Sequence, residues 1–286
     1  MNFKKVDLSF QSSLADYPEA KVVIFSAPMD ITTSFRPGTR FAGNAVRVDS
    51  IGIEWYSPYR NQSLKEVPTV DIGDLDLPIG DVEASLEVLY QTAKQILSDG
   101  KKPMMIGGEH LVTYPVVKAM KEKYPDLCLI HLDAHTDLRD EFLGRVLSHA
   151  TVIKRCHDLL GDERIYQFGI RSGDKEEFEW AESGHTELHR YDLNGLEETV
   201  KKIKSRPVYI TIDLDVLDPS IFPGTGTPEP GGITYKELLK AFDLFSQLTH
   251  IVGADLVELS PMLDASGAST AVAGKSLREM VLLLHQ

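Results

Sequence analysis

The sequence has few cysteines, no long apolar run and little positive charge. Its only cysteines are Cys128 and Cys156. Because both lie in apolar segments, we interpret them as buried small hydrophobic residues, which disfavours a disulfide framework. The apolar runs are far shorter than the roughly 20 residues of a membrane-spanning helix, and the N-terminal segment lacks the apolar core of a secretory signal. We therefore expect a cytoplasmic protein that does not span a membrane.

The scarcity of positive charge excludes two further classes. Thirty lysines and arginines stand against 43 aspartates and glutamates, a formal net charge of −13 at pH 7. This sign is wrong for a protein that binds nucleic acid or an anionic membrane through electrostatics, but it is compatible with a small cationic substrate. A phosphoesterase is disfavoured because no glycine-rich phosphate loop with a paired lysine is evident.

The chain shows no internal boundary. It has no fixed-period repeat, no Gly/Ser linker and no block of like charge. We expect a single domain over residues 1–286, although one large domain or two small ones would fit this length.

Short apolar runs rich in β-formers alternate with longer helical patterns. The expected strands span residues 22–26, 104–106, 127–132, 165–170, 208–212 and 251–257. The clearest helix repeats its apolar residues from Leu86 to Leu97, before Gly100. Another begins at Thr234, which has capping-box spacing to Glu237. This alternation predicts an α/β fold with a central, mainly parallel sheet.

Proline and glycine make up seven of the ten residues in 223–232. An expected strand precedes this segment and a capped helix follows it. We therefore interpret it as an ordered loop rather than as a linker.

Three expected strands end in potential metal ligands. Ligands bind at the carboxyl ends of the strands in open parallel sheets, and period-two alternation brings ligands two residues apart to one side of a strand. We therefore expect six side chains to point to one place: His110, Asp133, His135, Asp137, Asp213 and Asp215.

Each of these residues alone has an ordinary structural explanation. An Asp-Leu-Asp segment after a strand is typical of a turn or a helix cap, and a lone histidine is more often a hydrogen-bonded, partly buried residue. Four converging carboxylates without cations, however, would repel one another or take up protons. A pair of divalent ions resolves this conflict. Four oxygen and two nitrogen ligands suit Mn²⁺ best, while Zn²⁺, Fe²⁺, Co²⁺ and Ni²⁺ stay open.

At these residues the sequence resembles the ureohydrolase family of arginases, agmatinases and related amidinohydrolases, and most closely its agmatinase branch. The similarity spans most of the chain as an ordered set of motifs: Pro28, Asp30 and residues 36–38, 107–110, 133–137, 148–149, 213–215, 224–228, 258 and 260–261. It implies a three-layer α/β/α fold with a central parallel sheet and a homo-oligomer, a trimer or hexamer. Residues 138–147 lack the Asn and Ser pattern that binds the α-carboxylate in arginases, which argues against arginine.

The resemblance also implies two Mn²⁺ ions and divides the ligands between them: His110 and Asp137 for one, His135 and Asp215 for the other, with Asp133 and Asp213 bridging both. The implied reaction is hydrolysis of agmatine to urea and putrescine, a step of polyamine biosynthesis, in which a metal-bridging hydroxide attacks the guanidinium carbon.

The resemblance gives four side chains a role in this reaction. Asp137 would protonate the departing amine, and His149 would shuttle protons to solvent. Glu258 would pair with the guanidinium, and Thr227 would orient it. Without the resemblance, we would interpret His149 as a helix cap and Glu258 as an exposed strand-end charge.

Two alternatives stay open. The same chemistry could act on another guanidino or formimino substrate, such as guanidinobutyrate, guanidinopropionate or arginine. An acidic substrate would need a basic group at the mouth, and the loops offer Arg36, Arg40, Arg139 and Arg145. A non-catalytic metal-binding homologue would be expected to have lost a ligand or His149, and this chain has lost neither.

Overall fold

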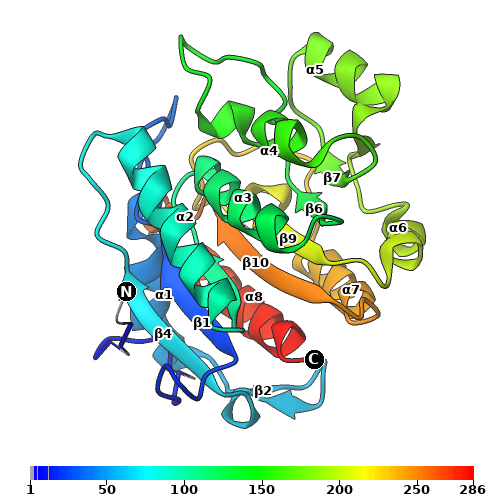
Figure 1. The fold of residues 1–286 in the computed structure, drawn as a ribbon. Coiled ribbons are helices and arrows are strands. Elements are labelled where there is room, and N and C mark those ends of the chain that lie inside the picture. The colour runs from blue at the N-terminus through cyan, green and yellow to red at the C-terminus, as the bar shows by residue number, and fades with distance from the viewer. Residues whose placement is uncertain (1–2, 5, 12) are drawn as a thin grey trace.

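The computed structural model describes residues 3–4, 6–11 and 13–286. Its central feature is an eight-stranded sheet in the order β4-β1-β5-β10-β9-β6-β7-β8 (Figure 1). Every neighbouring pair in this sheet is parallel. The strands are β1 (Val22–Ser26), β4 (Thr69–Asp74), β5 (Lys102–Ile106), β6 (Cys128–Leu132), β7 (Ile165–Ile170), β8 (Glu187–Arg190), β9 (Val208–Asp213) and β10 (Ile251–Val257). A small hairpin pairs β2 (Tyr56–Ser57) with β3 (Gln62–Ser63).

Helices cover both faces of the sheet, so the predicted three-layer α/β/α fold is confirmed (Figure 1). One face packs against α2 (Val82–Ser98), α3 (Thr113–Lys123) and α4 (Val152–Leu160). The other packs against α1 (Ala42–Asp49), α6 (Leu196–Ile203), α7 (Tyr235–Phe245) and α8 (Ala268–Leu284). A short helix, α5 (Lys175–Trp180), contacts α4 through Trp180. None of the helices in the described residues is long and apolar enough to cross a bilayer.

Strand alternation divides the apolar residues between two cores. In β5, Met105 packs with the α2–α4 side, whereas Met104 and Ile106 pack with the α1 and α8 side. Because both faces are buried, the central strands are apolar runs, and this is why the sequence predicts six of them.

Strands β4 and β8 escaped prediction for a physical reason. The apolar pattern of β4 is interrupted by Asp71 and Gly73, and the Asp71 carboxylate accepts hydrogen bonds from the buried Arg47 guanidinium. Strand β8 is a short, polar edge strand. In both, position in the sheet overrides the local composition.

The predicted capping box is present at the start of α7. The Thr234 backbone N–H donates to Glu237 Oε2 at 2.7 Å, and the Glu237 N–H donates to Thr234 Oγ1 at 3.3 Å. Helix α2 begins earlier than its apolar pattern, because the Asp81 carboxylate accepts from the Ala84 N–H at 3.0 Å.

Candidate active site

The site lies at the carboxyl ends of β5, β10, β9 and β6, four adjacent strands in the middle of the sheet. Each strand delivers polar side chains into loops at the same edge, as expected for an open parallel sheet. A cavity of about 240 Å³ opens there. Its lining includes His110, His135, Asp137, His149, Asp213, Thr227 and Glu258.

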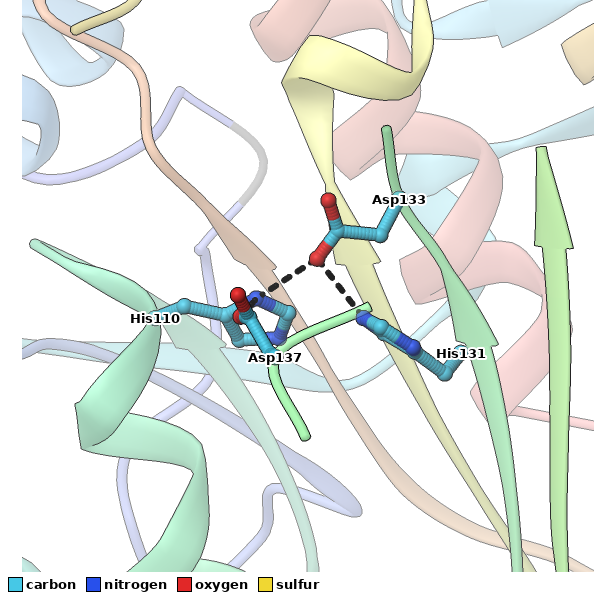
Figure 2. A group of neighbouring side chains, drawn as sticks. All are labelled: His110, His131, Asp133 and Asp137. Carbon is cyan, nitrogen blue, oxygen red and sulfur yellow. Dashed lines mark hydrogen bonds and ion pairs between the residues drawn. The ribbon is translucent and has the colours of Figure 1, made fainter. Parts of the chain in front are cut away.

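Two histidines each face a group of carboxylates. His110 Nδ1 lies 3.1 Å from Asp133 Oδ2, 3.2 Å from Asp137 Oδ2 and 3.3 Å from Asp213 Oδ2. Figure 2 shows how His110, Asp133 and Asp137 converge. His135 Nδ1 lies 3.0 Å from Asp215 Oδ2 and 3.4 Å from Asp133 Oδ1. Asp133 therefore offers one oxygen to each group, which is the arrangement required of a shared ligand.

Turns, rather than a continued pleat, bring these ligands together. Strand β9 ends at Asp213, and Asp215 lies in the 3₁₀ turn Leu214–Val216, where its N–H donates to Asp213 Oδ1 at 2.9 Å. Likewise, the His135 N–H donates to Asp133 Oδ1 at 2.6 Å. The expectation that strand alternation aligns these pairs is wrong, because aspartates at strand ends favour such local turns.

Without bound cations, the close packing of buried carboxylates in this cluster is electrostatically unfavourable. Burial and the Asp133 charge raise the pKa of Asp137 to about 7. Burial and the neighbouring Asp215 raise the pKa of Asp213 well above its usual range. Although burial opposes it, the carboxylates raise the pKa of His110 well above its usual value. Divalent cations would take the place of the protons that the cluster would otherwise bind.

Two buried atoms of the six expected ligands also lack a hydrogen-bond partner, namely His110 Nδ1 and Asp215 Oδ2. Both point into the cluster, within 3.3 Å of other ligand atoms. Unpaired buried polar atoms are rare in proteins, and an ion would satisfy these two. The donor set therefore fits a pair of divalent ions.

The orientation of His110 is set from behind by a network that the sequence analysis missed. Thr211 Oγ1 donates to Asp255 Oδ1 at 2.6 Å, so it accepts from His110 Nε2 at 2.9 Å. Thr113 and Tyr209 also donate to the fully buried Asp255 carboxylate. The proton of His110 is thereby placed on Nε2, and the lone pair of Nδ1 faces the carboxylates. A charged residue within the apolar run of β10 was the available signal.

A second supporting residue, His131, was also missed. Gln167 Nε2 donates both to Thr136 O at 2.9 Å and to His131 Nδ1 at 3.1 Å. His131 Nε2 therefore carries the proton and donates to Asp133 Oδ2 at 2.7 Å (Figure 2). The signal was a histidine within the apolar run of β6, two residues before Asp133.

Asp137 and Glu258 have left-handed backbones, with φ of 53° and 63°. Such conformations are unfavourable for non-glycine residues and are often found at functional sites. The Asp137 carbonyl accepts from the N–H groups of Ile153 and Lys154, both at 3.1 Å. Glu258 Oε1 accepts from the His110 N–H at 2.8 Å. Because Glu258 is only 6% exposed, its interpretation as an exposed strand-end charge is wrong.

His149 borders the cavity beside the loop that follows β1. Its Nε2 lies 3.2 Å from Ser34 Oγ, and its ring packs edge-on against Phe142 at 5.6 Å. Burial lowers the pKa of His149 to about 4, so the ring is neutral near pH 7. The helix cap at this point is Ser148, which forms a capping box with Thr151. The interpretation of His149 as the cap is therefore wrong.

The proline- and glycine-rich segment 223–232 is an ordered loop that carries Thr227 to the cavity. Arg36 donates to the carbonyls of Thr225 at 2.8 Å and Gly226 at 3.0 Å. A Cβ on Gly226 would lie 2.8 Å from the Arg36 carbonyl oxygen. The loop therefore needs glycine where the two chain segments meet, and the alternative of a flexible linker is wrong.

The arginines proposed for the mouth differ in their surroundings. Arg36 is committed to loop carbonyls, Arg40 pairs with Asp30, and Arg145 lines a neighbouring cavity. Only Arg139 lines the central cavity.

Arg139 is itself neutralised by the rim. Its guanidinium lies 2.6 Å from Asp174 and 3.3 Å from Glu177. These two carboxylates line the same cavity, so this part of the rim carries more negative than positive charge.

Comparison with known proteins agrees with this geometry. The arginase family profile matches residues 20–283. The chain is 50% identical over 275 residues to an agmatinase of Bacillus anthracis, covering 96% of this chain and 95% of the relative. It is 31% identical over 290 residues to a guanidinobutyrase of Pseudomonas aeruginosa, covering 95% and 89%. The solved structure of an agmatine ureohydrolase of Thermoplasma volcanium superposes with a TM-score of 0.87 at 34% identity, covering 99% of this chain and 94% of that one. The chain belongs to the arginase family.

Proposed function

We propose that this protein hydrolyses agmatine to urea and putrescine with a pair of Mn²⁺ ions. The observation that carries the proposal is the meeting of two histidines and four aspartates at the floor of a cavity, with a buried glutamate beside them. The relationship to agmatinases over nearly the whole chain supports agmatine as the substrate.

The ligands would divide between the two ions as the family resemblance implies. His110 and Asp137 would bind one ion, His135 and Asp215 the other, and Asp133 and Asp213 both. Two ions held this way would lower the pKa of a bound water, and so would supply a hydroxide nucleophile at neutral pH. Oxygen-rich ligands favour Mn²⁺, although other divalent ions suit the set.

The remaining chemistry belongs to the side chains around the cavity. Asp137, at the edge of the cavity and beside the nucleophile, would deliver a proton to the departing amine, as the resemblance implies. His149, neutral and hydrogen-bonded to Ser34 near the cavity wall, can pass protons to solvent.

Glu258 and Thr227 would hold the substrate. The His110 N–H anchors one oxygen of the Glu258 carboxylate, which fixes its orientation toward a guanidinium. Thr227 lines the same cavity from the ordered loop.

The acidic rim favours a cationic tail on the substrate. Agmatine ends in an ammonium group, whereas guanidinobutyrate ends in a carboxylate. Asp174 and Glu177 would attract the first and repel the second, because Arg139 neutralises only part of their charge. Because a guanidinobutyrase is among the relatives, guanidinobutyrate is the second candidate substrate.

We also infer a cytoplasmic homo-oligomer, a trimer or hexamer, that acts in polyamine biosynthesis. The resemblance to ureohydrolases carries this inference.

The test is urea release from agmatine, arginine and guanidinobutyrate by Mn²⁺-loaded protein and by the same protein stripped of metal. We expect metal-dependent urea from agmatine, with little from the other two. Urea release from guanidinobutyrate but not from agmatine would mean that guanidinobutyrate, rather than agmatine, is the substrate. No urea from any of them, with metal bound, would contradict the proposal.

A further inference from the structure

A second group of two histidines and a carboxylate lies outside the active-site cavity. It consists of His157 on α4, Asp162 in the following loop and His185 at the end of the π-helical turn Ala181–His185. His157 Nε2 lies 2.8 Å and His185 Nδ1 lies 2.9 Å from the same atom, Asp162 Oδ1. The three ligand atoms are all within 4.8 Å of one another.

One aromatic ring orients both imidazoles. His185 stacks on Trp180 with a centroid distance of 4.4 Å and an interplanar angle of 16°. His157 meets the same ring edge-on at 4.7 Å. The Lys154 ammonium lies 4.8 Å from the Trp180 centroid. Packing therefore fixes the directions of the two histidine nitrogens before any ligand arrives.

The carboxylate is more accessible than the histidines. The Asp162 side chain is 59% exposed, compared with 14% for His157 and 36% for His185. Asp162 can therefore adjust its position, and water can reach the point that the three groups face.

Two imidazoles and one carboxylate are ligands that zinc and nickel accept. In a tetrahedral zinc site the ligand atoms lie about 3.3 Å apart, so the two distances from Asp162 Oδ1 to the histidine nitrogens would each widen by roughly half an ångström. Each ring nitrogen would bind through its lone pair, with its proton moving to the other ring nitrogen or to solvent. We propose that His157, Asp162 and His185 form a second, surface site for a borderline divalent ion such as Zn²⁺, completed by water.

Such an ion would connect α4 to the segment that follows α5 (Figure 1). The N-terminal half of α5 is already fixed, because the Glu177 carboxylate accepts from the Leu138 N–H at 2.9 Å and forms an ion pair with Arg139. The ion would tie down the other end, beyond Trp180. Binding only to the folded state would also stabilise the protein.

Trp180 provides a reporter that is independent of catalysis. The protein has two tryptophans, so a Trp55→Phe background leaves Trp180 as the only one. In Mn²⁺-loaded protein of this background, we expect Ni²⁺ to quench Trp180 fluorescence saturably and Zn²⁺ to compete with it. Losing even a supporting group commonly weakens metal affinity by about 10–100-fold. His157→Asn or His185→Asn should therefore weaken Ni²⁺ binding at least about tenfold.

His250→Asn is the matched control, because His250 is an exposed histidine that contacts an aromatic ring, Tyr124. It should leave the quenching unchanged. Zn²⁺ should also raise the melting temperature of the Mn²⁺-loaded protein, and His185→Asn should abolish that increase. No saturable quenching, or equal quenching in the His157→Asn and His185→Asn variants, would overturn the site.

Discussion

The buried cluster at the strand ends and the surface cluster beside Trp180 contain the same kinds of side chain in opposite surroundings. In the first, Asp133 and Asp213 are almost fully buried, and burial raises the pKa of Asp213. In the second, Asp162 is exposed, and hydrogen bonds from His185 and His157 lower its pKa. The two clusters share residue types and close spacing, so burial makes the difference. Buried carboxylates need bound cations or protons to stay close together, whereas exposed ones are stabilised by water.

The two clusters also differ in their ratio of oxygen to nitrogen ligands. The buried cluster offers four carboxylates and two imidazoles, whereas the surface cluster offers one carboxylate and two imidazoles. The first composition favours Mn²⁺ and the second favours Zn²⁺ or Ni²⁺. This contrast leads to the following predictions, given from the largest expected effect to the smallest.

Asp213→Ala should have the largest effect. It removes a carboxylate that faces His110 at 3.3 Å, so metal binding and urea formation should be lost together. Metal content by mass spectrometry and urea assays measure the two outcomes. Asp243→Ala, at an exposed position on α7, is the control, and near-normal turnover in Asp213→Ala would contradict the role of the cluster.

His149→Ala should slow turnover by roughly 10²–10⁴-fold, the usual cost of losing an acid–base group. The variant should keep its metal, because His149 Nε2 faces Ser34 rather than the ligands. Steady-state kinetics and metal analysis on the same sample separate these effects. An unchanged rate would remove His149 from the mechanism.

Thr211→Val should weaken metal binding by about 10–100-fold, because it leaves His110 Nε2 without its acceptor. Thr113→Val is the matched control, since Thr113 donates to the same Asp255. Competition with a chelator measures both affinities. Equal losses in the two variants would mean that Thr211 does not act by orienting His110.

In the metal-free protein, His149 should lower the free energy of unfolding as the pH falls from 6.5 toward about 4. The raised pKa values of Asp137 and Asp213 act in the opposite direction, so the His149 contribution is isolated by comparison with a variant. The unfolded chain binds a proton on this histidine below pH 6.5, whereas the folded chain resists it until about pH 4. His149→Ala should reduce this loss by on the order of 1–2 kcal/mol. Denaturant unfolding of both proteins across this pH window measures the difference, and equal slopes would contradict the buried, neutral state.

Asp162→Asn should have the smallest effect on stability. Exposed pairs contribute about 0.2–1 kcal/mol, so the free energy of unfolding should change by less than about 1 kcal/mol and agmatine turnover should not change. A larger loss, measured by denaturant unfolding without added Zn²⁺, would show that the surface cluster is a structural element in its own right.

Much of this architecture follows from sequence pattern. The central strands are recognisable because both faces are buried, and parallel topology then requires their polar ends to meet at one edge. The capping box at Thr234 and Glu237 is equally local. These features depend on residues that are close in the sequence, so one amino-acid sequence is enough to predict them.

The supporting residues were missed because their roles depend on long-range contacts. Asp255 and Thr211 lie on different strands, and only the pairing of β9 with β10 brings them together. His131 is meaningful only beside Gln167 on β7. The turns at Asp133 and Asp213 were missed for another reason: a strand pattern does not show where its pleat ends.

The most direct test of the central claim is to measure bound Mn²⁺ and agmatine turnover together as metal is returned to stripped protein. Two buried groups that share Asp133 predict two ions per chain at the catalytic cluster, with urea and putrescine appearing in equal amounts as the pair fills. The surface site should be blocked by His185→Asn so that it does not add to the count. Full turnover without metal, or a filled pair that releases no urea from agmatine, would contradict the account.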